Sequence, residues 1–353
     1  MTLALGAALG CAPHVDARFA GAAARADALY VAGRYRQSAD AWLAASCTAK
    51  TGYDEDEAVY RAAESFVKAG EPGPAESLLV RLATGKGERA ARAGFDRALL
   101  IAETEPERAQ TLRLQALEQH PESGVAAQAL REYLAYVEEH AGEVAALSRC
   151  ETLRAQFAAT ELDEAASYQC AARHERHGDE ALALRAYLTT AERHPYPHGA
   201  LWDDALAGAA RCEERLGDAR AAIGTLERML ARREHAALFG SYERSRYAEA
   251  RFHIAELYRD ALGDPERAAH EFRRVYDEHP TSLLLDDALF EEALIEARSG
   301  KAERACATVR LLVSHEPASH YAGCTRLLCA SAAAPKRSCA DELKAKIDGD
   351  AGR

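Results

Sequence analysis

The segments EARFHIAELYRDALGDPERAAHEFRRVYDEHP (249–280) and DALFEEALIEARSGKAERACATVRLLVSHEP (287–317) decide the fold. Each has apolar residues at helical spacing, then a Gly, then a second amphipathic run that ends at a Pro. Gly tolerates the positive φ that a tight turn between helices needs, and Pro cannot continue a helix. The stretch from 247 to 317 therefore predicts two consecutive helix-turn-helix repeats.

Five positions correspond between the two segments: a turn Gly, a small residue one turn into the second helix, two large apolar residues and a closing Pro. They are Gly263, Ala268, Phe272, Val275 and Pro280, and then Gly300, Ala305, Val309, Leu312 and Pro317. The small residue lets the paired helices approach closely. These positions resemble the tetratricopeptide repeat, whose period is about 34 residues.

The small-residue position recurs along the whole chain, every 34 to 39 residues except for 46 between the sixth and seventh members. Its members are Ser38, Ala75, Ala109, Ala145, Ala183, Ala222, Ala268 and Ala305. The resemblance implies an all-α fold, a right-handed superhelical solenoid of about eight helix-turn-helix repeats. Because the end of such an array needs a cap, we expect the helix from His320 to Ala332 to cover the last repeat.

The repeat pattern, together with what the N-terminal resemblance described below implies, predicts five segments. Residues 1–16 are a lipoprotein signal peptide and tether, 17–234 an N-terminal helical-repeat array, 235–246 a linker, 247–334 the C-terminal repeats and cap, and 335–353 a polar, partly disordered tail.

Composition limits the classes of partner. The chain of 353 residues has 44 Lys and Arg against 56 Asp and Glu, a net charge of -12. Nucleic acids and anionic membranes favour a basic surface, so we expect protein partners and no nucleic acid. Contact with a membrane is expected through a lipid anchor only.

The N-terminus carries the apolar run Leu3 to Leu9 and the sequence Ala8-Leu9-Gly10-Cys11, which resembles the lipobox of bacterial lipoproteins. The resemblance implies cleavage before Cys11, lipidation of its thiol and, with Ala12 following, passage to the outer membrane. The match departs from the family at Ala8, where Leu is commonest, and no Lys or Arg precedes the apolar run. In the alternative interpretation, residues 3–10 begin the first helix.

Eight cysteines remain after Cys11, an even number that fits an oxidising periplasm. In the repeat alignment Cys150 with Cys170, and Cys306 with Cys324, connect one repeat to the next, and Cys329 with Cys339 would close the C-terminal hairpin. Cys47 and Cys212 are left unassigned. The alternative is that these cysteines are buried small hydrophobic residues.

No pattern of catalysis or ligand chemistry is found. The sequence has no Gly-X-Ser-X-Gly, no dinucleotide-binding glycines and no CxxC pair, and Pro317 interrupts the pair His315 and His320. The acidic run 53–57 is typical of a helix start, and Gly85-Lys86-Gly87 reads as a connector. We expect no enzyme activity, no cofactor, no metal site and no small-molecule substrate.

What remains is a surface. In tetratricopeptide folds the first helix of each repeat lines a concave groove, and the resemblance assigns eight residues to it: Tyr168, Arg176, Arg211, Arg215, Phe252, Arg259, Phe290 and Arg298. Arg binds carboxylates through two parallel hydrogen bonds, and aromatic rings bury area at low entropic cost. The alternative is that the arginines pair with neighbouring Glu residues and the rings pack inside their own repeats.

Together, the lipobox and repeats resemble two envelope families: the lipoprotein of the outer-membrane barrel-assembly machine and the periplasmic tetratricopeptide proteins that coordinate cell division. We therefore expect a non-enzymatic scaffold or adaptor on the outer membrane, facing the periplasm, that binds partner proteins in its groove. The alternative is a cytosolic tetratricopeptide adaptor or regulatory protein without a lipid anchor.

Overall fold

The computed structural model describes residues 16–232, 245–333 and 337–349. Within these ranges all regular structure is helical, with eighteen α-helices, one short π-helix (η1), one short 3-10 helix (η2) and no strand. The all-α fold that the sequence predicts is confirmed. Cys11 and nearly all of the predicted linker 235–246 lie outside the described residues.

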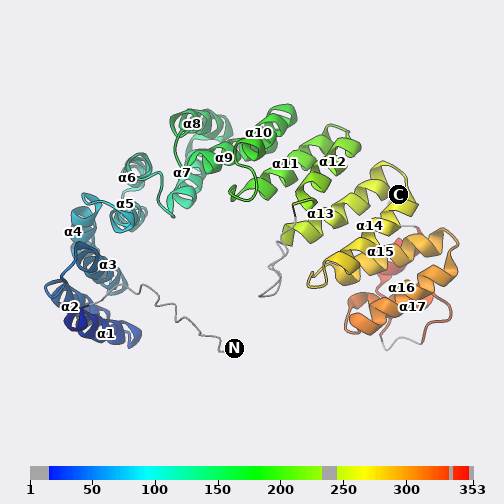
Figure 1. Ribbon diagram of the computed structural model, residues 1–353, viewed down its shortest axis with the longest axis horizontal. Helices are drawn as coiled ribbons and strands as arrows, with labels where there is room; N and C mark the ends of the chain where they lie inside the picture. The colour runs from blue at the N-terminus through cyan, green and yellow to red at the C-terminus, as the bar shows by residue number, and fades with distance from the viewer. Residues whose placement is uncertain (1–15, 233–244, 334–336, 350–353) are drawn as a thin grey trace, which may run out of the picture. The chain divides into compact units, whose positions relative to one another are not determined.

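The chain forms two compact units, residues 1–166 and 167–353, and the boundary falls inside α9. The N-terminal unit contains four helix pairs, seen from blue to teal in Figure 1. They are α1 (Ala17–Val31) with α2 (Tyr35–Ser46), α3 (Gly52–Lys68) with α4 (Pro72–Ala83), α5 (Glu88–Leu100) with α6 (Pro106–Gln119), and α7 (Ala126–Ala141) with α8 (Glu143–Gln156).

The C-terminal unit continues the same arrangement and then adds a short cap. Its pairs are α9 (Asp163–His177) with α10 (Glu180–Arg193), α11 (Trp202–Arg215) with α12 (Ala219–Leu230), α13 (Ser245–Glu256) with α14 (Pro265–Glu278), and α15 (Leu285–Arg298) with α16 (Ala302–His315). Helix α13 runs on into η1 (Leu257–Ala261), and the end of the chain holds η2 (His320–Cys324), α17 (Thr325–Leu328) and α18 (Asp341–Asp348).

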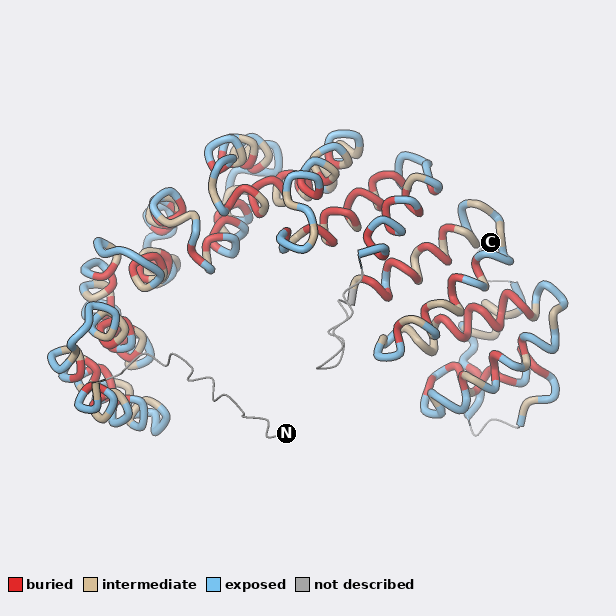
Figure 2. The backbone as a smooth tube through the Cα atoms, in the orientation of Figure 1, coloured by how far each residue is buried: buried red, intermediate tan, exposed pale blue. Residues whose placement is uncertain are grey.

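The turns between paired helices use glycine as the sequence predicts. Gly178, Gly217, Gly263 and Gly300 have φ of 85°, 85°, 61° and 72°, a region in which a Cβ is strained. Five residues after each of them lies a fully buried alanine: Ala183, Ala222, Ala268 and Ala305, each 0% exposed. Figure 2 shows the buried residues on the faces that neighbouring helices turn toward each other. The positions that recur in the sequence are therefore the turn glycines and the buried contact residues between helices.

The fourth repeat differs from the prediction by one residue. Ala146, not Ala145, is the buried small residue, at 0% exposed. The cause is a shorter turn, because α8 begins directly after Gly142, whereas one residue separates the turn glycine from the second helix in the C-terminal unit, as Asp179 does after Gly178. With one turn residue fewer, the buried position lies four residues after the glycine instead of five, at Ala146.

The predicted capping helix is replaced by shorter helical segments with different disulfide partners. Instead of one helix from His320 to Ala332, η2 and α17 end at Cys329, whose backbone is extended, and residues 341–348 of the predicted polar tail form α18. The expected pairing of the last four cysteines is wrong. Cys306 bonds Cys329 and Cys324 bonds Cys339, because the folded-back cap brings the alternate partners together.

The other cysteines divide into two kinds. Cys150 and Cys170 are each disulfide-bonded, and their pairing with each other stays a prediction. Cys47 is free and exposed, and Cys212 is free and buried, where burial raises the pKa of its thiol to about 12. Cys212 is therefore a small apolar core residue rather than a reactive thiol.

Candidate functional site

Four of the eight predicted groove residues lie in one cleft of about 470 Å³ within the C-terminal unit. It lies between the first helices α9 and α11 and reaches the second helix α10; Figure 1 shows these helices in green. We call it the arginine cleft. Its lining residues are Tyr168, Ala172, Glu175, Arg176, Tyr187, Arg211 and Arg215.

Glu175 organises the charged side of this cleft. The guanidinium of Arg211 donates from Nε to Oε1 at 2.8 Å and from Nη2 to Oε2 at 2.9 Å. Arg215 lies 3.1 Å from the same carboxylate, and the hydroxyl of Tyr187 donates to it at 2.7 Å. Such two-point contacts fix both partners in orientation. Arg211 is therefore held as part of the wall.

Burial and charge act in opposite directions on this cluster. Burial raises the pKa of Glu175, but the hydrogen bonds from Arg211 and Tyr187 and the nearby positive charges outweigh it, so that its pKa lies below the ordinary value. Burial, followed by the bond to Glu175, raises the pKa of Tyr187. Glu175 thus stays ionised and Tyr187 stays a neutral donor near neutral pH.

A glycine in α11 makes room for the floor of the cleft. A Cβ on Gly208 would lie 2.5 Å from Cζ of Tyr187, closer than side chains allow. The absent side chain lets the Tyr187 ring, which is 0% exposed, lie flat against α11. Tyr168 packs on it with the ring centroids 5.7 Å apart. The buried Tyr187 ring therefore supports the half-buried Tyr168 ring beside the arginines.

The rim is the part that a partner can reach. Arg176 is exposed at the last turn of α9, and the side chain of Arg215 is 47% exposed at the last turn of α11. Arg215 also lies 3.1 Å from Glu180 of α10. Three arginines and one glutamate line the cleft, so cations outnumber carboxylates in its lining even with Glu180 beside Arg215, although the whole chain is acidic.

The structure does not bring the other four predicted groove residues into the arginine cleft. Phe252 is half-buried and packs edge-to-face on Phe272 at 5.0 Å, and Arg259 pairs with Asp260 and with Glu291 at 2.7 and 2.6 Å. Phe290 is 0% exposed and Arg298 is exposed; both contact the C-terminal segment, as described below. For Phe252 and Arg259 the contacts are those of the alternative interpretation, packing and pairing near their own repeat.

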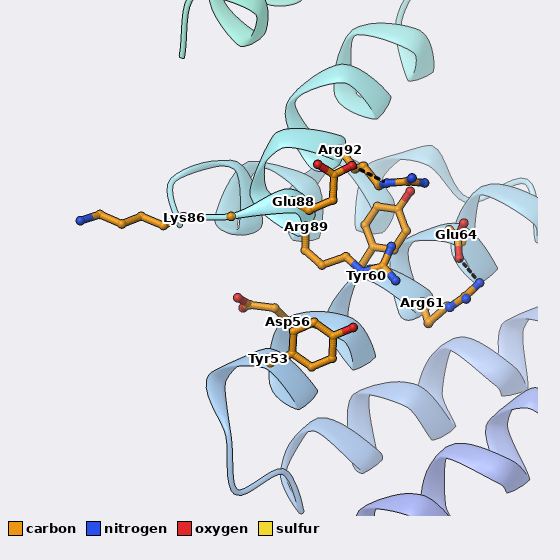
Figure 3. A pocket seen from close by; sticks show the side chains of 10 residues that line it. Tyr53, Asp56, Tyr60, Arg61, Glu64, Lys86, Glu88, Arg89 and Arg92 are labelled. Atoms are coloured by element: carbon orange, nitrogen blue, oxygen red, sulfur yellow. Dashed lines mark hydrogen bonds and ion pairs between the residues drawn. The ribbon is translucent and has the colours of Figure 1, made fainter. Parts of the chain in front are cut away.

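A second cleft, of about 490 Å³, lies between α3 and α5 in the N-terminal unit, and the sequence analysis missed it. Figure 3 shows its lining, with Arg89 beside the ring of Tyr60 and with Arg61 and Arg92 paired to Glu64 and Glu88. Its lining residues are Tyr53, Asp56, Tyr60, Arg61, Glu64, Lys86, Gly87, Glu88, Arg89 and Arg92.

This N-terminal cleft repeats the construction of the arginine cleft. The buried Tyr60 donates to Asp96 at 2.6 Å, and the Arg89 guanidinium lies 4.7 Å from the Tyr60 ring centroid. Burial, then the bond to Asp96, raises the pKa of Tyr60. Tyr53 and Tyr60 are seven residues apart and so share a helix face, a signal that the interpretation of residues 53–57 as a helix start overlooked.

The described residues include neither a candidate metal-binding cluster nor a helix able to span a membrane. Among the residues that the structure describes, no group of three or more His, Cys, Asp or Glu side chains is placed to hold a metal ion. No described helix combines the length and apolar composition that a membrane span requires. The described clefts offer hydrogen bonds, cations and aromatic faces.

Comparisons with known proteins agree with the repeat pattern. A tetratricopeptide repeat family model matches residues 249–282, from α13 to just beyond α14. This match supports the tetratricopeptide resemblance there. No curated protein sequence matches the chain.

Several solved structures are similar over long stretches at low identity. A tetratricopeptide repeat protein from Parabacteroides merdae is 14% identical, with 78% of this chain and 98% of that chain covered and a TM-score of 0.37. The C-terminal part of a repeat-containing protein from Cytophaga hutchinsonii is 13% identical, with 76% and 99% covered and a TM-score of 0.46. Kinesin-light-chain-like repeats from Podosopora anserina are 15% identical, with 56% and 98% covered and a TM-score of 0.41.

Proposed function

We propose that this protein is a non-enzymatic interaction scaffold that binds an acidic segment of a partner protein in the arginine cleft. The observation that carries the proposal is the positive cleft itself, in which Arg176 and Arg215 form the rim above a fixed Arg211–Glu175 pair. A carboxylate entering the cleft meets the guanidinium groups of Arg176 and Arg215 at its rim, and Glu175 and Glu180 hold that of Arg215 in place. The half-buried Tyr168 ring then covers an apolar side chain next to that carboxylate.

Preorganisation supports this assignment. Because Arg211 is already held by two hydrogen bonds, and because Tyr187 is fully buried, little side-chain entropy is lost when a partner binds. The surrounding acidic surface repels acidic segments elsewhere on the molecule, which directs them to the cleft.

The binding test compares labelled dodecapeptides on the full chain by fluorescence anisotropy. One peptide carries Asp and Glu around a central Leu, and its match carries Asn and Gln at the same positions. We expect the acidic peptide to bind, and Arg176→Glu with Arg215→Glu to weaken it by at least tenfold. Arg220→Glu with Arg228→Glu on the exposed side of α12 changes the net charge equally and is the matched control. Equal weakening by both pairs, or equal binding of both peptides, would contradict the proposal.

The proposal places this scaffold in the cell envelope, anchored through a lipid on Cys11. Its support is the lipobox around Cys11 and the two disulfides of the cap, which fit an oxidising compartment. In a diderm host we expect the wild type to carry a diacylglycerol mass and sediment with membranes, and Cys11→Ala to do neither.

The second candidate is the cytosolic adaptor without a lipid. It rests on the free cysteines Cys47 and Cys212 and on the partial lipobox match. Titration of thiols in protein trapped rapidly from cells separates the two. Reduced cysteines throughout, with no lipid mass, favour the cytosolic adaptor.

A further inference from the structure

The last helix of the chain lies on the same surface that the arginine cleft occupies in earlier repeats. Lys346 of α18 forms an ion pair with Glu291 of α15, and its ammonium lies 5.9 Å from the Phe290 ring centroid. The guanidinium of Arg298 donates to the backbone carbonyl of Lys346. Two of the predicted groove residues are thus engaged by the chain's own C-terminal segment.

The contact surface of α18 has a simple pattern. Leu343 and Ile347 pack against the cluster that contains Phe290 and Leu294. Positions 343, 346 and 347 have the spacing i, i+3 and i+4, so that they share one face of the helix. That face therefore presents two apolar side chains with a lysine between them, opposite an aromatic ring and a carboxylate.

The surface under α18 carries two carboxylates, Glu291 and Asp260, and Arg259 pairs with both of them. Glu291 is 4% exposed and also pairs with Arg259. The pKa of Asp260 lies below its ordinary value, chiefly because of its bond to Arg259 and in part because of the charge of Lys346. Glu291 pairs with Lys346 as well as with Arg259, so Lys346 is the cation that α18 adds to this surface.

Helix α18 is held weakly by itself. It has eight residues, none of them buried, and its N-cap Ala340 has no side-chain hydrogen bond to the helix. Helices this short are unstable in isolation. A covalent tether adds to the contacts of Lys346, Leu343 and Ile347, because the Cys324–Cys339 disulfide ends two residues before Asp341. A short tether raises the local concentration of α18 at its surface.

We infer that the α15 surface around Phe290, Glu291 and Arg298 is a second docking surface, for a partner helix with a lysine between two apolar residues, and that α18 is a built-in occupant which this helix displaces. This inference goes beyond the proposed function, since it concerns a separate surface that selects the opposite charge. A partner helix repeats the α18 contacts: its lysine pairs with Glu291 and its apolar pair covers Phe290.

The probe for this surface is α18 itself, supplied in trans. A labelled peptide of residues 338–349, with Cys339→Ser, is stapled across positions 344 and 348, away from the contact face. The receptor is the full chain with Leu343→Asp and Ile347→Asp, which detach its own α18. We expect the peptide to bind this receptor at least tenfold more tightly than the wild-type chain, and the same peptide with Lys346→Glu not to bind.

Two outcomes would overturn the inference: equal affinity for wild-type and detached chains, or no binding to the detached chain. Amide hydrogen exchange on the wild type gives an independent test, because α18 should exchange at least a hundredfold faster than α15. If α18 exchanges as slowly as α15, it is an integral cap and the inference fails. The Arg176→Glu and Arg215→Glu chain is expected to leave peptide binding unchanged, which keeps this test separate from that of the arginine cleft.

Discussion

The arginine cleft and the α15 surface are built from corresponding residues, yet one is open and the other is covered. Arg176, Arg215 and Arg298 each lie in the last turn of a first helix. In the cleft Arg215 contacts Glu175 and stays 47% exposed, whereas Arg298 donates to the backbone of α18. The repeat pattern therefore decides where a side chain lies, and the rest of the chain decides whether a partner can reach it.

The two places also select different charges. At the cleft three arginines and Glu175 form the lining, and at α15 a lysine from α18 meets Glu291. Because opposite charges sit at corresponding places of one unit, the surface can distinguish an acidic segment from a basic helix.

The largest expected difference between the α15 surface and the arginine cleft is in the free energy of unfolding lost when an aromatic ring is removed. Phe290 is 0% exposed and stacks on Tyr321 at 4.1 Å, so Phe290→Ala should lower the free energy of unfolding by about 3–5 kcal/mol. Tyr168 is half-buried at the open cleft, and Tyr168→Ala should cost about 1 kcal/mol. Urea unfolding followed by circular dichroism measures both. Equal losses would mean that Tyr168 is a core residue and the cleft is not open.

The next prediction concerns the tether of α18. Cys324→Ser with Cys339→Ser opens a loop with a sequence separation of 15, which should cost about 3 kcal/mol. It should also speed hydrogen exchange throughout α18. The control, Cys306→Ser with Cys329→Ser, removes a bond of separation 23 but leaves the tether of α18 intact. If both pairs change exchange in α18 equally, the tether does not hold this helix in place.

A smaller effect is expected at the floor of the cleft. Gly208→Ala pushes a Cβ into the Tyr187 ring and should destabilise the chain by about 1–3 kcal/mol while weakening acidic-peptide binding. Gly224→Ala in α12 is the matched control, since nothing lies within 4 Å of its new Cβ. That change should stabilise the helix by up to about 1 kcal/mol. A neutral Gly208→Ala in thermal melts would show that the ring can move aside.

The smallest expected effect is a pH dependence of stability at the contact between α11 and α13. His253 of α13 lies 3.2 Å from Glu256 and 2.9 Å from Glu214 of α11, and Arg259 lies 4.0 Å from Glu256. The bond to Glu256, against the effect of burial, and the charge of Glu214 raise the pKa of His253.

A raised folded-state pKa means that this stabilisation is complete below the unfolded pKa of about 6.5 and is lost as pH rises through the folded value. The stability difference between wild type and His253→Gln should therefore be largest near pH 5.5 and shrink above pH 8, as measured by urea unfolding at each pH. A difference that grows with pH would contradict the assignment.

The repeats can be predicted from the sequence because each one uses the same kinds of residue at the same packing positions. Gly178 occupies a turn with positive φ, and Ala183 occupies a helix contact that only a small residue fits. Their spacing can therefore be recognised in the sequence. The shift to Ala146 depends on a turn shortened by one residue, which the average period conceals.

The cap and the sites are less visible in the sequence. Cysteine spacing does not determine which pairs meet, and the composition of the tail hides the single face made by Leu343, Lys346 and Ile347. Within the arginine cleft, four rim and wall residues follow from the repeat register, but Tyr187 does not, because it reaches the cleft from a second helix.

The most direct test of the scaffold places a photo-crosslinking benzoylphenylalanine at Tyr168 in the full chain, expressed in its native host, and compares it with the same group at Leu182. Leu182 lies on α10 and is 42% exposed outside the cleft. The account predicts one discrete protein adduct from position 168, lost with Arg176→Glu and Arg215→Glu, and none from position 182. An adduct from position 182 alone, or one from 168 that survives the charge reversal, would contradict it.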